Sequence, residues 1–364
     1  MSAETKTSEE NQSTSKTEPE IVQEKNKFIF KYQKENINEK LGNILGEKFR
    51  KYRDDFNKTQ DYEITGFLPD VPLTIAIEFI NRCNLKCIMC YTKHHTEEKA
   101  TLSLDDIDRI MKECKDNETP SVIVGLGSEM TLYKDIKEAL DLIRKNEIID
   151  VFFGSNGVLM TEEIIKSIMK NKISRVEISL DAATPETYKK IRSFDQLTRI
   201  EANIEKLIEY KKRYNSPLPV IRLCFVLQEK NKHEAQMFID KWKDKVDYID
   251  FQRCVDMSNM DEVNTKINYE ELKDAFCSQP FYSLSVWSNG NVSPCCTYYG
   301  KKLILGNVRE TSLKELWHGE KINRIRQQLI AKKFNPVCAK CLYFRDKENI
   351  EKTLLTPASV PTTN

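Results

Sequence analysis

The sequence lacks an excess of charge of either sign. Its 57 Lys and Arg residues stand against 56 Asp and Glu residues, which gives a formal net charge of +1. A nearly neutral chain has no net field to draw it toward nucleic acid or an anionic membrane, so neither partner is expected.

Long apolar runs are also lacking. No stretch approaches the roughly 20 apolar residues that a membrane-spanning helix needs. The N-terminal stretch MSAETKTSEENQSTSKTEPE contains no apolar segment of the kind that a secretory signal has. We therefore expect a soluble, cytoplasmic protein.

Cysteine, in contrast, is abundant, with 11 residues in the chain. Without an export signal, and in a reducing cytoplasm, these cysteines do not indicate a disulfide framework. Metal ligands, reactive thiols and packed core residues are the alternatives.

The middle of the chain alternates between short apolar segments and amphipathic segments of helical period. Short buried strands that alternate with helices predict a parallel sheet built from βαβ units. Six strands are too few for a closed eight-stranded barrel, so the pattern predicts an α/β fold with an open, partial (β/α)6 barrel. In such folds the functional groups lie on loops after the carboxyl ends of the strands. The expected strands are 73–80, 121–127, 150–157, 175–182, 220–228 and 248–254.

The segments before and after the expected barrel have different sequence patterns. Residues 266–350 suggest a small α+β domain, with a hairpin around Asn289-Gly290, one helix over 312–333 and a cysteine knuckle at 335–341. The full division expected from the sequence is a disordered tail over 1–25, a charged helical segment over 26–70, the barrel over 71–265, the small domain over 266–350 and a second disordered tail over 351–364.

The stretch NRCNLKCIMCYT places Cys83, Cys87 and Cys90 directly after the first expected strand. Clustered thiolates bind soft metals. A zinc site requires four ligands, and this loop offers three. On a cubane iron–sulfur cluster, three thiolates leave one iron open to a small molecule. Unrelated cysteines, or part of a zinc knuckle, are the alternatives.

This three-cysteine loop resembles that of radical S-adenosylmethionine (SAM) enzymes. The resemblance implies a [4Fe–4S] cluster on Cys83, Cys87 and Cys90, with SAM on the open iron and Tyr91 beside the cofactor. It further implies that one electron, from a flavodoxin- or ferredoxin-type reductant, cleaves SAM to a 5′-deoxyadenosyl radical. That radical then abstracts a hydrogen atom from the substrate.

The stretch GLGSEM follows the second strand and is similar to the family's GGE motif. Gly127, Ser128 and Glu129 are the matching residues, and the resemblance implies that they bind the SAM amino group. Ser128 replaces the second Gly, and Met130 replaces the Pro that usually follows. An ordinary turn is the alternative.

Further matches end the third and fourth strands. Asn156 lies in SNG, which is similar to the family's TNG. The resemblance places Ser179 and Asp181 near the SAM ribose and pairs Arg192 with the SAM carboxylate, which suits a guanidinium. A tight turn at Asn156 and a surface charge at Arg192 are the alternatives.

A second cysteine set resembles the opening of the SPASM domain. Twelve residues separate Cys277 from Gly290, and four more precede Cys295. No cysteine follows the final CxxC, so the resemblance is to the shortened twitch form with one auxiliary [4Fe–4S] cluster. Spacing favours Cys295 over Cys296, and a structural zinc site is the alternative. The implied ligands are Cys277, Cys295, Cys338 and Cys341.

Cys254 ends the sixth strand, where a thiol could donate a hydrogen atom to a substrate radical. A half-buried loop cysteine is the alternative. The expected function is a radical SAM oxidoreductase or epimerase that acts on an unactivated C–H bond of a sugar, a cyclitol or a similar small polar substrate. The alternatives are a maturase of a ribosomal peptide and a non-catalytic iron–sulfur or zinc protein.

Overall fold

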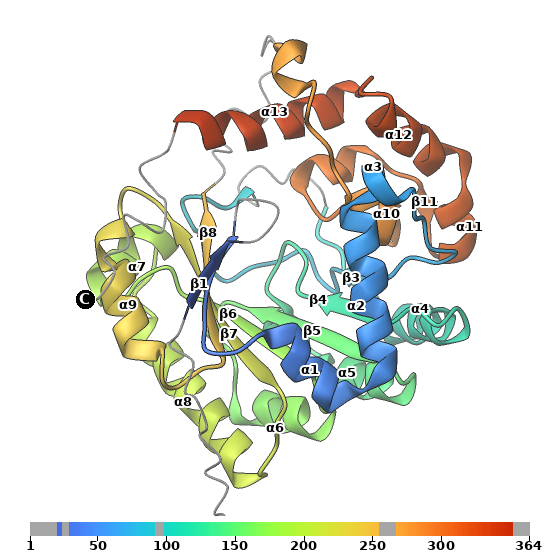
Figure 1. The fold of residues 1–364 in the computed structure, drawn as a ribbon. Helices are drawn as coiled ribbons and strands as arrows, with labels where there is room; N and C mark the ends of the chain where they lie inside the picture. The colour runs from blue at the N-terminus through green and yellow to red at the C-terminus, as the bar shows by residue number, and fades with distance from the viewer. Residues whose placement is uncertain (1–19, 24–28, 92–97, 255–266, 352–364) are drawn as a thin grey trace, which may run out of the picture.

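The computed structural model describes residues 20–23, 29–91, 98–254 and 267–351 (Figure 1). Within these ranges, one sheet of 11 strands runs in the order β1-β2-β8-β7-β6-β5-β4-β3-β9-β10-β11. Its centre, from β8 to β3, is parallel throughout.

The six central strands are those expected from the sequence. They pair in chain order and do not close on themselves, since the outer two pair with strands from elsewhere in the chain. The prediction of an open, partial barrel is therefore confirmed. The strands are β3 Thr74–Ile77, β4 Ser121–Val124, β5 Asp150–Ser155, β6 Arg175–Ser179, β7 Val220–Leu227 and β8 Tyr248–Arg253.

Amphipathic helices connect these strands and cover one face of the sheet. The first of them begins at a capping box, in which the Ser103 hydroxyl and the Asp106 carboxylate each accept the other's backbone N–H. Its buried side chains, Cys114 among them, join the main core. The helices are α4 Leu104–Asp116, α5 Ile136–Lys145, α6 Glu162–Lys170, α7 Pro185–Arg192, α8 Leu197–Arg213 and α9 Ala235–Trp242.

The N-terminal region corrects two expectations. Strand β1 Glu20–Gln23 lies in the expected disordered tail, and β2 Ile29–Gln33 lies in the expected helical segment. Strand β2 pairs antiparallel with β8, whose residues lie more than 200 positions later in the chain. Pairing over that separation leaves no local sequence signal.

Helices follow these two strands, as expected: α1 Ile37–Leu45, α2 Glu47–Gln60 and α3 Tyr62–Thr65. Leu41, Phe49 and Tyr52 of α1 and α2 pack with Val220 and Tyr248. These last two residues begin β7 and β8. Helices α1 and α2 therefore cover the amino end of the barrel, opposite the end that carries the cysteine loop.

The C-terminal region extends the barrel sheet. Strand β9 Ser283–Val286 pairs parallel with β3, and β10 Asn291–Ser293 forms the expected hairpin with β9. The short strand β11 Gly306–Asn307 completes this edge. The expected boundary near residue 265 is therefore bridged by continuous strand pairing.

Helices α12 and α13 form an arc along the top of Figure 1. The single helix expected over 312–333 is divided into α11 Leu313–His318 and α12 Glu320–Ile330 by the extended backbone of Gly319. The expected cysteine knuckle is instead the start of helix α13 Pro336–Glu351. No helix in the described part of the chain is both long and apolar enough to cross a membrane.

Trp317 of α11 joins this C-terminal region to the segment before β3. Its ring is fully buried, its Nε1 donates to the Pro69 carbonyl at 2.9 Å, and the Arg326 guanidinium lies 4.1 Å from the ring centroid. One side chain therefore combines apolar burial, a long-range hydrogen bond and a cation–π contact.

We predict that Trp317→Ala lowers the free energy of unfolding by about 3–5 kcal/mol, because it opens a large cavity and leaves the Pro69 carbonyl without this donor. Urea unfolding of the apoprotein measures the change. The matched control is Ile330→Ala on α12, whose side chain is 48% exposed. That substitution should cost less than about 0.5 kcal/mol. Equal losses in the two variants would contradict the anchoring role of Trp317.

Candidate functional site

The three-cysteine loop leaves the carboxyl end of β3 and is fastened to helix α7. The Ile88 N–H donates to the Ile191 carbonyl at 3.0 Å, and the Ser193 hydroxyl donates to the Lys86 carbonyl. Of the three thiols, Cys83 is exposed, Cys87 is buried and Cys90 is half-buried. Contacts from more than 100 residues away therefore fix the loop.

The thiols of this loop lie close enough to interact electrostatically. Although Cys83 as a residue is exposed, the groups packed around its thiol exclude water and, together with the nearby Glu129, Cys87 and Cys90, raise its pKa to about 11. Burial also raises the pKa of Cys87, which Arg192 partly offsets. Thiols in such surroundings become thiolates when a cation binds them, because metal ligation displaces the proton.

Asn156, directly after β5, reaches across to this loop. Its Nδ2 donates to Asn84 Oδ1 at 2.7 Å and lies 3.8 Å from Cys83 Sγ. Its own Oδ1 accepts from the Val158 N–H at 3.0 Å. The amide group is therefore oriented from both ends.

Glu129 links the second strand to the first and third. Its buried carboxylate accepts from the Asn156 N–H at 2.7 Å and from the Ser155 hydroxyl at 2.8 Å. Its own N–H donates to the Arg82 carbonyl at 2.9 Å. The neighbouring Ser128 hydroxyl remains local and donates to the Leu126 carbonyl.

Gly127 is in the left-handed region, with φ +64°. An ideal Cβ at this position would lie 2.5 Å from the Tyr91 hydroxyl and 3.4 Å from Glu78 Oε1. Only glycine fits this turn without displacing its neighbours. Tyr91 of the cysteine loop therefore lies against the turn that precedes Glu129.

Arg192 ends α7 beneath the cysteine loop. Its Nη1 donates to Cys87 Sγ at 3.4 Å, and its Nη2 lies 2.6 Å from Asp181 Oδ2. Arg192 Nε is buried and has no hydrogen-bond partner among the residues described. A buried, unsatisfied N–H beside a thiol loop fits an anionic group of a bound ligand.

Asp181 differs from its expected role. Its side chain is fully buried, and its carboxylate is engaged by Arg192 and by the Val226 N–H at 2.7 Å. It therefore has no face open to a ribose and instead orients Arg192. Ser179, which ends β6, is half-buried.

The four late cysteines expected as ligands also come together. The Cys295 thiol interacts electrostatically with Cys277 and Cys341, and the Cys338 thiol interacts with Cys277. Burial raises the pKa of Cys338 to about 11, and it raises the pKa of Cys295 as well. Cys296 also lies near Cys277, but it packs against a separate apolar cluster formed by Ala76, Leu126 and Trp287.

The cysteine sets are not arranged around a single point in the described structure. Across the described residues, no three or more His, Cys, Asp and Glu side chains form a group that could hold one metal ion. Each cysteine of a cubane binds a different iron, so its thiolates need not converge on one point.

Cys254 follows β8 directly and is half-buried. It therefore lies at the same end of the parallel sheet as the three-cysteine loop. The two other cysteines outside both sets, Cys114 and Cys224, are buried in α4 and β7.

Sequence reasoning missed a set of charges on the face of the sheet turned away from the helices. Arg222 pairs with Glu177 at 2.8 Å and also with Asp250, and Arg175 pairs with Asp150. The carboxylates of Asp150 and Asp250 are fully buried, whereas the Glu177 and Arg222 side chains keep 18% and 14% of their surface exposed. Charged residues at alternate positions of apolar strands were the available signal.

Glu78 was also missed, although it is a charged residue in the apolar stretch LTIAIEFI. Its side chain is 1% exposed and lies 3.6 Å from Lys301 Nζ, which comes from the C-terminal region. The sequence around Lys301 gives no signal for such a contact.

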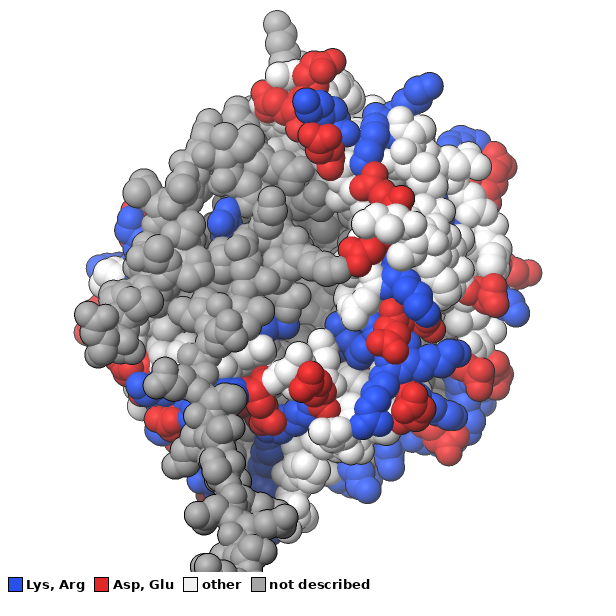
Figure 2. Space-filling view, in the orientation of Figure 1, with Lys and Arg blue, Asp and Glu red and all other residues white. Residues whose placement is uncertain are grey.

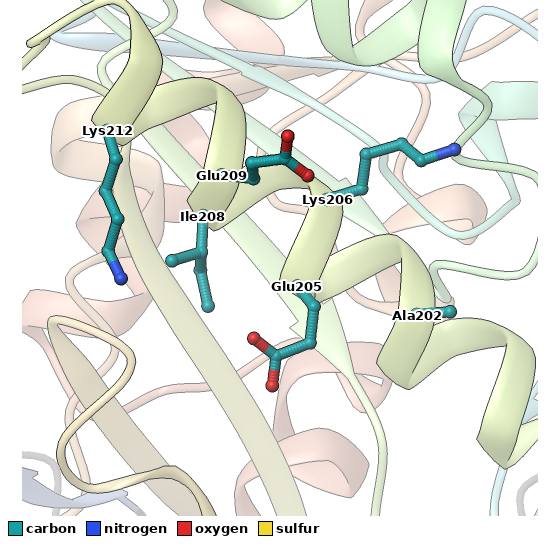
Figure 3. A pocket seen from close by; sticks show the side chains of 6 residues that line it. All are labelled: Ala202, Glu205, Lys206, Ile208, Glu209 and Lys212. Carbon is teal, nitrogen blue, oxygen red and sulfur yellow. The ribbon is translucent and has the colours of Figure 1, made fainter.

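A depression on the outer side of α8 is a separate feature (Figure 3). It holds no cysteine and lies on the exposed side of the helix, so it is not part of the site. The depression is lined by Ala202, Glu205, Lys206, Ile208, Glu209 and Lys212.

In the face shown in Figure 2, positive and negative side chains lie interspersed on the described surface.

Sequence comparison finds relatives over part of the chain. A probable GTP 3′,8-cyclase of Methanococcus maripaludis is 33% identical over 129 residues, which is 35% of this chain and 43% of that protein. A probable GTP 3′,8-cyclase of Methanocaldococcus jannaschii is 29% identical over 137 residues, 37% of this chain and 45% of the relative. The chain thus spans less than half the length of these curated relatives.

Solved structures share the fold. The structure of native anSMEcpe with bound AdoMet has a TM-score of 0.55 at 19% identity, covering 75% of this chain and 88% of that one. Streptococcus suis SuiB has a TM-score of 0.54 at 17% identity, covering 77% and 72%.

Two family models match the chain. Residues 77–241 match the radical SAM superfamily, and residues 277–342 match an iron–sulfur cluster-binding domain. These domains imply [4Fe–4S] clusters and SAM as cofactors, and the two cysteine sets fit them. Residues 77–241 therefore form a radical SAM domain, and residues 277–342 form an iron–sulfur cluster-binding domain of the SPASM type.

Proposed function

We propose that this protein cleaves SAM and abstracts a hydrogen atom from an unactivated C–H bond of a small polar substrate, with oxidation or epimerisation as the outcome. The observation that carries the proposal is the convergence of two strand ends and of helix α7 on the cysteine loop. Asn156 contacts Cys83, Arg192 contacts Cys87, and Glu129 binds the backbone of Arg82.

Cys83, Cys87 and Cys90 would hold the [4Fe–4S] cluster, which would supply the electron for reductive cleavage of SAM. The residues of the chain hold and orient SAM. The backbone of the turn at Gly127–Glu129 receives the amino group, because the Glu129 carboxylate is buried and already accepts from Thr131, Ser155 and Asn156. Arg192, whose Nε has no protein partner among the described residues, receives the carboxylate, a charge-assisted contact.

Other residues hold the SAM-contacting residues and the cysteine loop in position. Asp181 holds Arg192 by an ion pair, and Asn156 holds the loop at Asn84. Ser179 lies at the neighbouring strand end and is the remaining candidate for a ribose contact. Asp181 acts through Arg192.

A polar substrate is supported by the inner face of the sheet, the face turned away from the helices. Glu177 and Arg222 keep part of their side chains exposed there. Gly154, opposite Glu177 in the strand register, contributes no side chain and leaves space beside the carboxylate. Hydroxyl groups of a sugar, cyclitol or nucleotide suit such a wall, because carboxylate and guanidinium offer an acceptor and donors.

A ribosomal peptide is the alternative substrate, since the related SuiB fold has been solved with a precursor peptide. The described N-terminal elements favour a smaller substrate. Strand β2 extends the barrel sheet, and α1 and α2 pack on its amino end, so these elements serve the barrel itself. A flavodoxin- or ferredoxin-type protein is the proposed reductant.

We predict that anaerobic reconstitution gives about eight irons per chain, because two cubane clusters hold four irons each. Cys83→Ala/Cys87→Ala/Cys90→Ala should hold about four and should form no 5′-deoxyadenosine. Iron analysis and chromatography of the SAM products measure both. The matched control, Cys114→Ala, removes a buried thiol of α4 and should keep wild-type iron. A triple variant that still cleaved SAM would overturn the proposal.

The auxiliary cluster gives a second prediction. Cys295→Ala should lower the iron content to about four per chain, whereas Cys296→Ala should retain about eight. The reason is that Cys295 interacts with both Cys277 and Cys341, whereas Cys296 interacts with Cys277 and packs against the apolar cluster that contains Trp287. Metal analysis distinguishes the outcomes. About four irons plus one zinc in the wild type would instead assign the late cysteines to a structural zinc site.

Cys254 is proposed as the donor that refills a substrate radical in an epimerisation. Its S–H hydrogen would pass to carbon, and the reductant would return one electron to the sulfur while water returns the proton. In D2O, Cys254→Ala should still form 5′-deoxyadenosine but should lose solvent deuterium from the product, because the exchangeable thiol is gone. Mass spectrometry of reactions with candidate sugars and cyclitols measures this. Undiminished deuterium in the product would eliminate the role.

A further inference from the structure

The short helix η5 Tyr298–Lys302 follows Cys295 and Cys296 and touches both parts of the site. Tyr299 is 5% exposed and packs against both Tyr91 and Cys341. The next residue, Gly300, lies so close to Cys295 that an ideal Cβ there would be 2.7 Å from its Sγ. Lys301 then faces Glu78. Three consecutive residues therefore connect the late cysteines with β3 and its loop.

The turn at Gly127 lies between two of the residues that η5 contacts. Tyr91 closes one side of the turn with its hydroxyl, and Glu78 closes another with its carboxylate. Tyr91 is packed by Tyr299, and Glu78 is paired with Lys301. Both walls of the turn are thus supported from the same helix.

The contact of Lys301 with Glu78 is buried and geometrically specified. The two side chains are 8% and 1% exposed, with Nζ 3.6 Å from Oε1. The other oxygen, Glu78 Oε2, accepts from the Ser288 hydroxyl at 2.8 Å and from the Ser288 N–H at 3.2 Å. A buried charge requires its partner, so removal of the ammonium disturbs the carboxylate beside Gly127.

The same ammonium has a second contact that leads to the turn. Lys301 Nζ lies 4.3 Å from the centroid of the Trp287 ring. Trp287 packs in one cluster with Leu126, which directly precedes Gly127. Lys301 therefore supports the turn through Glu78 on one side and through Trp287 on the other.

We propose that Tyr299 and Lys301 are positioning residues that couple the auxiliary cysteine site to the SAM-binding turn at Gly127. The proposal rests on the proposed function of that turn. Because the coupling of two binding sites is reciprocal, filling of the auxiliary site changes the affinity for SAM by the same factor as bound SAM changes the affinity of the auxiliary site. Neither residue contacts the reacting atoms.

The test compares Lys301→Met with Lys302→Met, which removes the same charge from an exposed neighbour. With both clusters reconstituted, equilibrium dialysis of labelled SAM should give a dissociation constant about tenfold higher for Lys301→Met, the lower end of what the loss of an orienting contact behind a ligand costs. Lys302→Met should bind as the wild type does, and Lys301→Arg should recover most of the affinity.

A second readout needs no cofactor. In the apoprotein, backbone amides of residues 125–130 should exchange with deuterium faster in Lys301→Met and in Tyr299→Leu than in the wild type or Lys302→Met. The double variant Glu78→Gln/Lys301→Met removes both buried charges. It should bind SAM no more weakly than Lys301→Met alone, because the two residues act through one contact.

The outcomes separate the two proposals. If the wild type binds no SAM, the proposed function fails, while exchange at residues 125–130 still tests the support of the turn. If the wild type binds SAM and Lys301→Met binds it equally well with unchanged exchange, the coupling by η5 is overturned. If Lys302→Met weakened SAM binding as much as Lys301→Met does, the effect would come from surface charge, and the coupling by η5 would also be overturned.

Discussion

Parallel pairing of the central strands is the constraint on which the site depends. Because β3 to β8 run in one direction, their carboxyl ends meet at one edge and bring together residues that are far apart in sequence. Cys83, Glu129 and Arg192 are joined there through contacts that no local segment could provide. The cysteine loop has no regular structure of its own, so its geometry is set by neighbouring strand ends and by α7.

Buried charge is the second organising feature. Replacing a buried ion pair with packed apolar residues often leaves a protein equally stable, so stability alone does not explain why such pairs are present. Here they occupy the inner face of the sheet and the edge that carries the cysteine loop, as with Arg222–Asp250 and Arg192–Asp181. Each ion pair holds a polar side chain in one orientation. A polar ligand that binds there therefore does not have to order that side chain itself.

The sequence predicted what local pattern encodes. The six strands follow from apolar runs between amphipathic helices, and both cysteine sets follow from spacing. Strand β2 was missed because its partner β8 is distant in the chain, and β1 in turn pairs with β2. The burial of Asp181 behind Arg192 and the pairing of Glu78 with Lys301 were missed for the same reason, since each depends on which elements pack together. Gly319 could have indicated the break between α11 and α12, since glycine weakens helix interiors.

The pairing of β9 with β3 determines how the two cysteine sets relate. The register joins Ile77 to Val286, and the Glu78 N–H continues the pairing to the Val286 carbonyl at 2.9 Å. Cys83 lies in the loop that follows β3. Cys295 follows β10, which forms a hairpin with β9. A shift of one residue between strands would turn every side chain to the opposite face. The register that buries the strands therefore also fixes the relative placement of both sites, without any role for linker length.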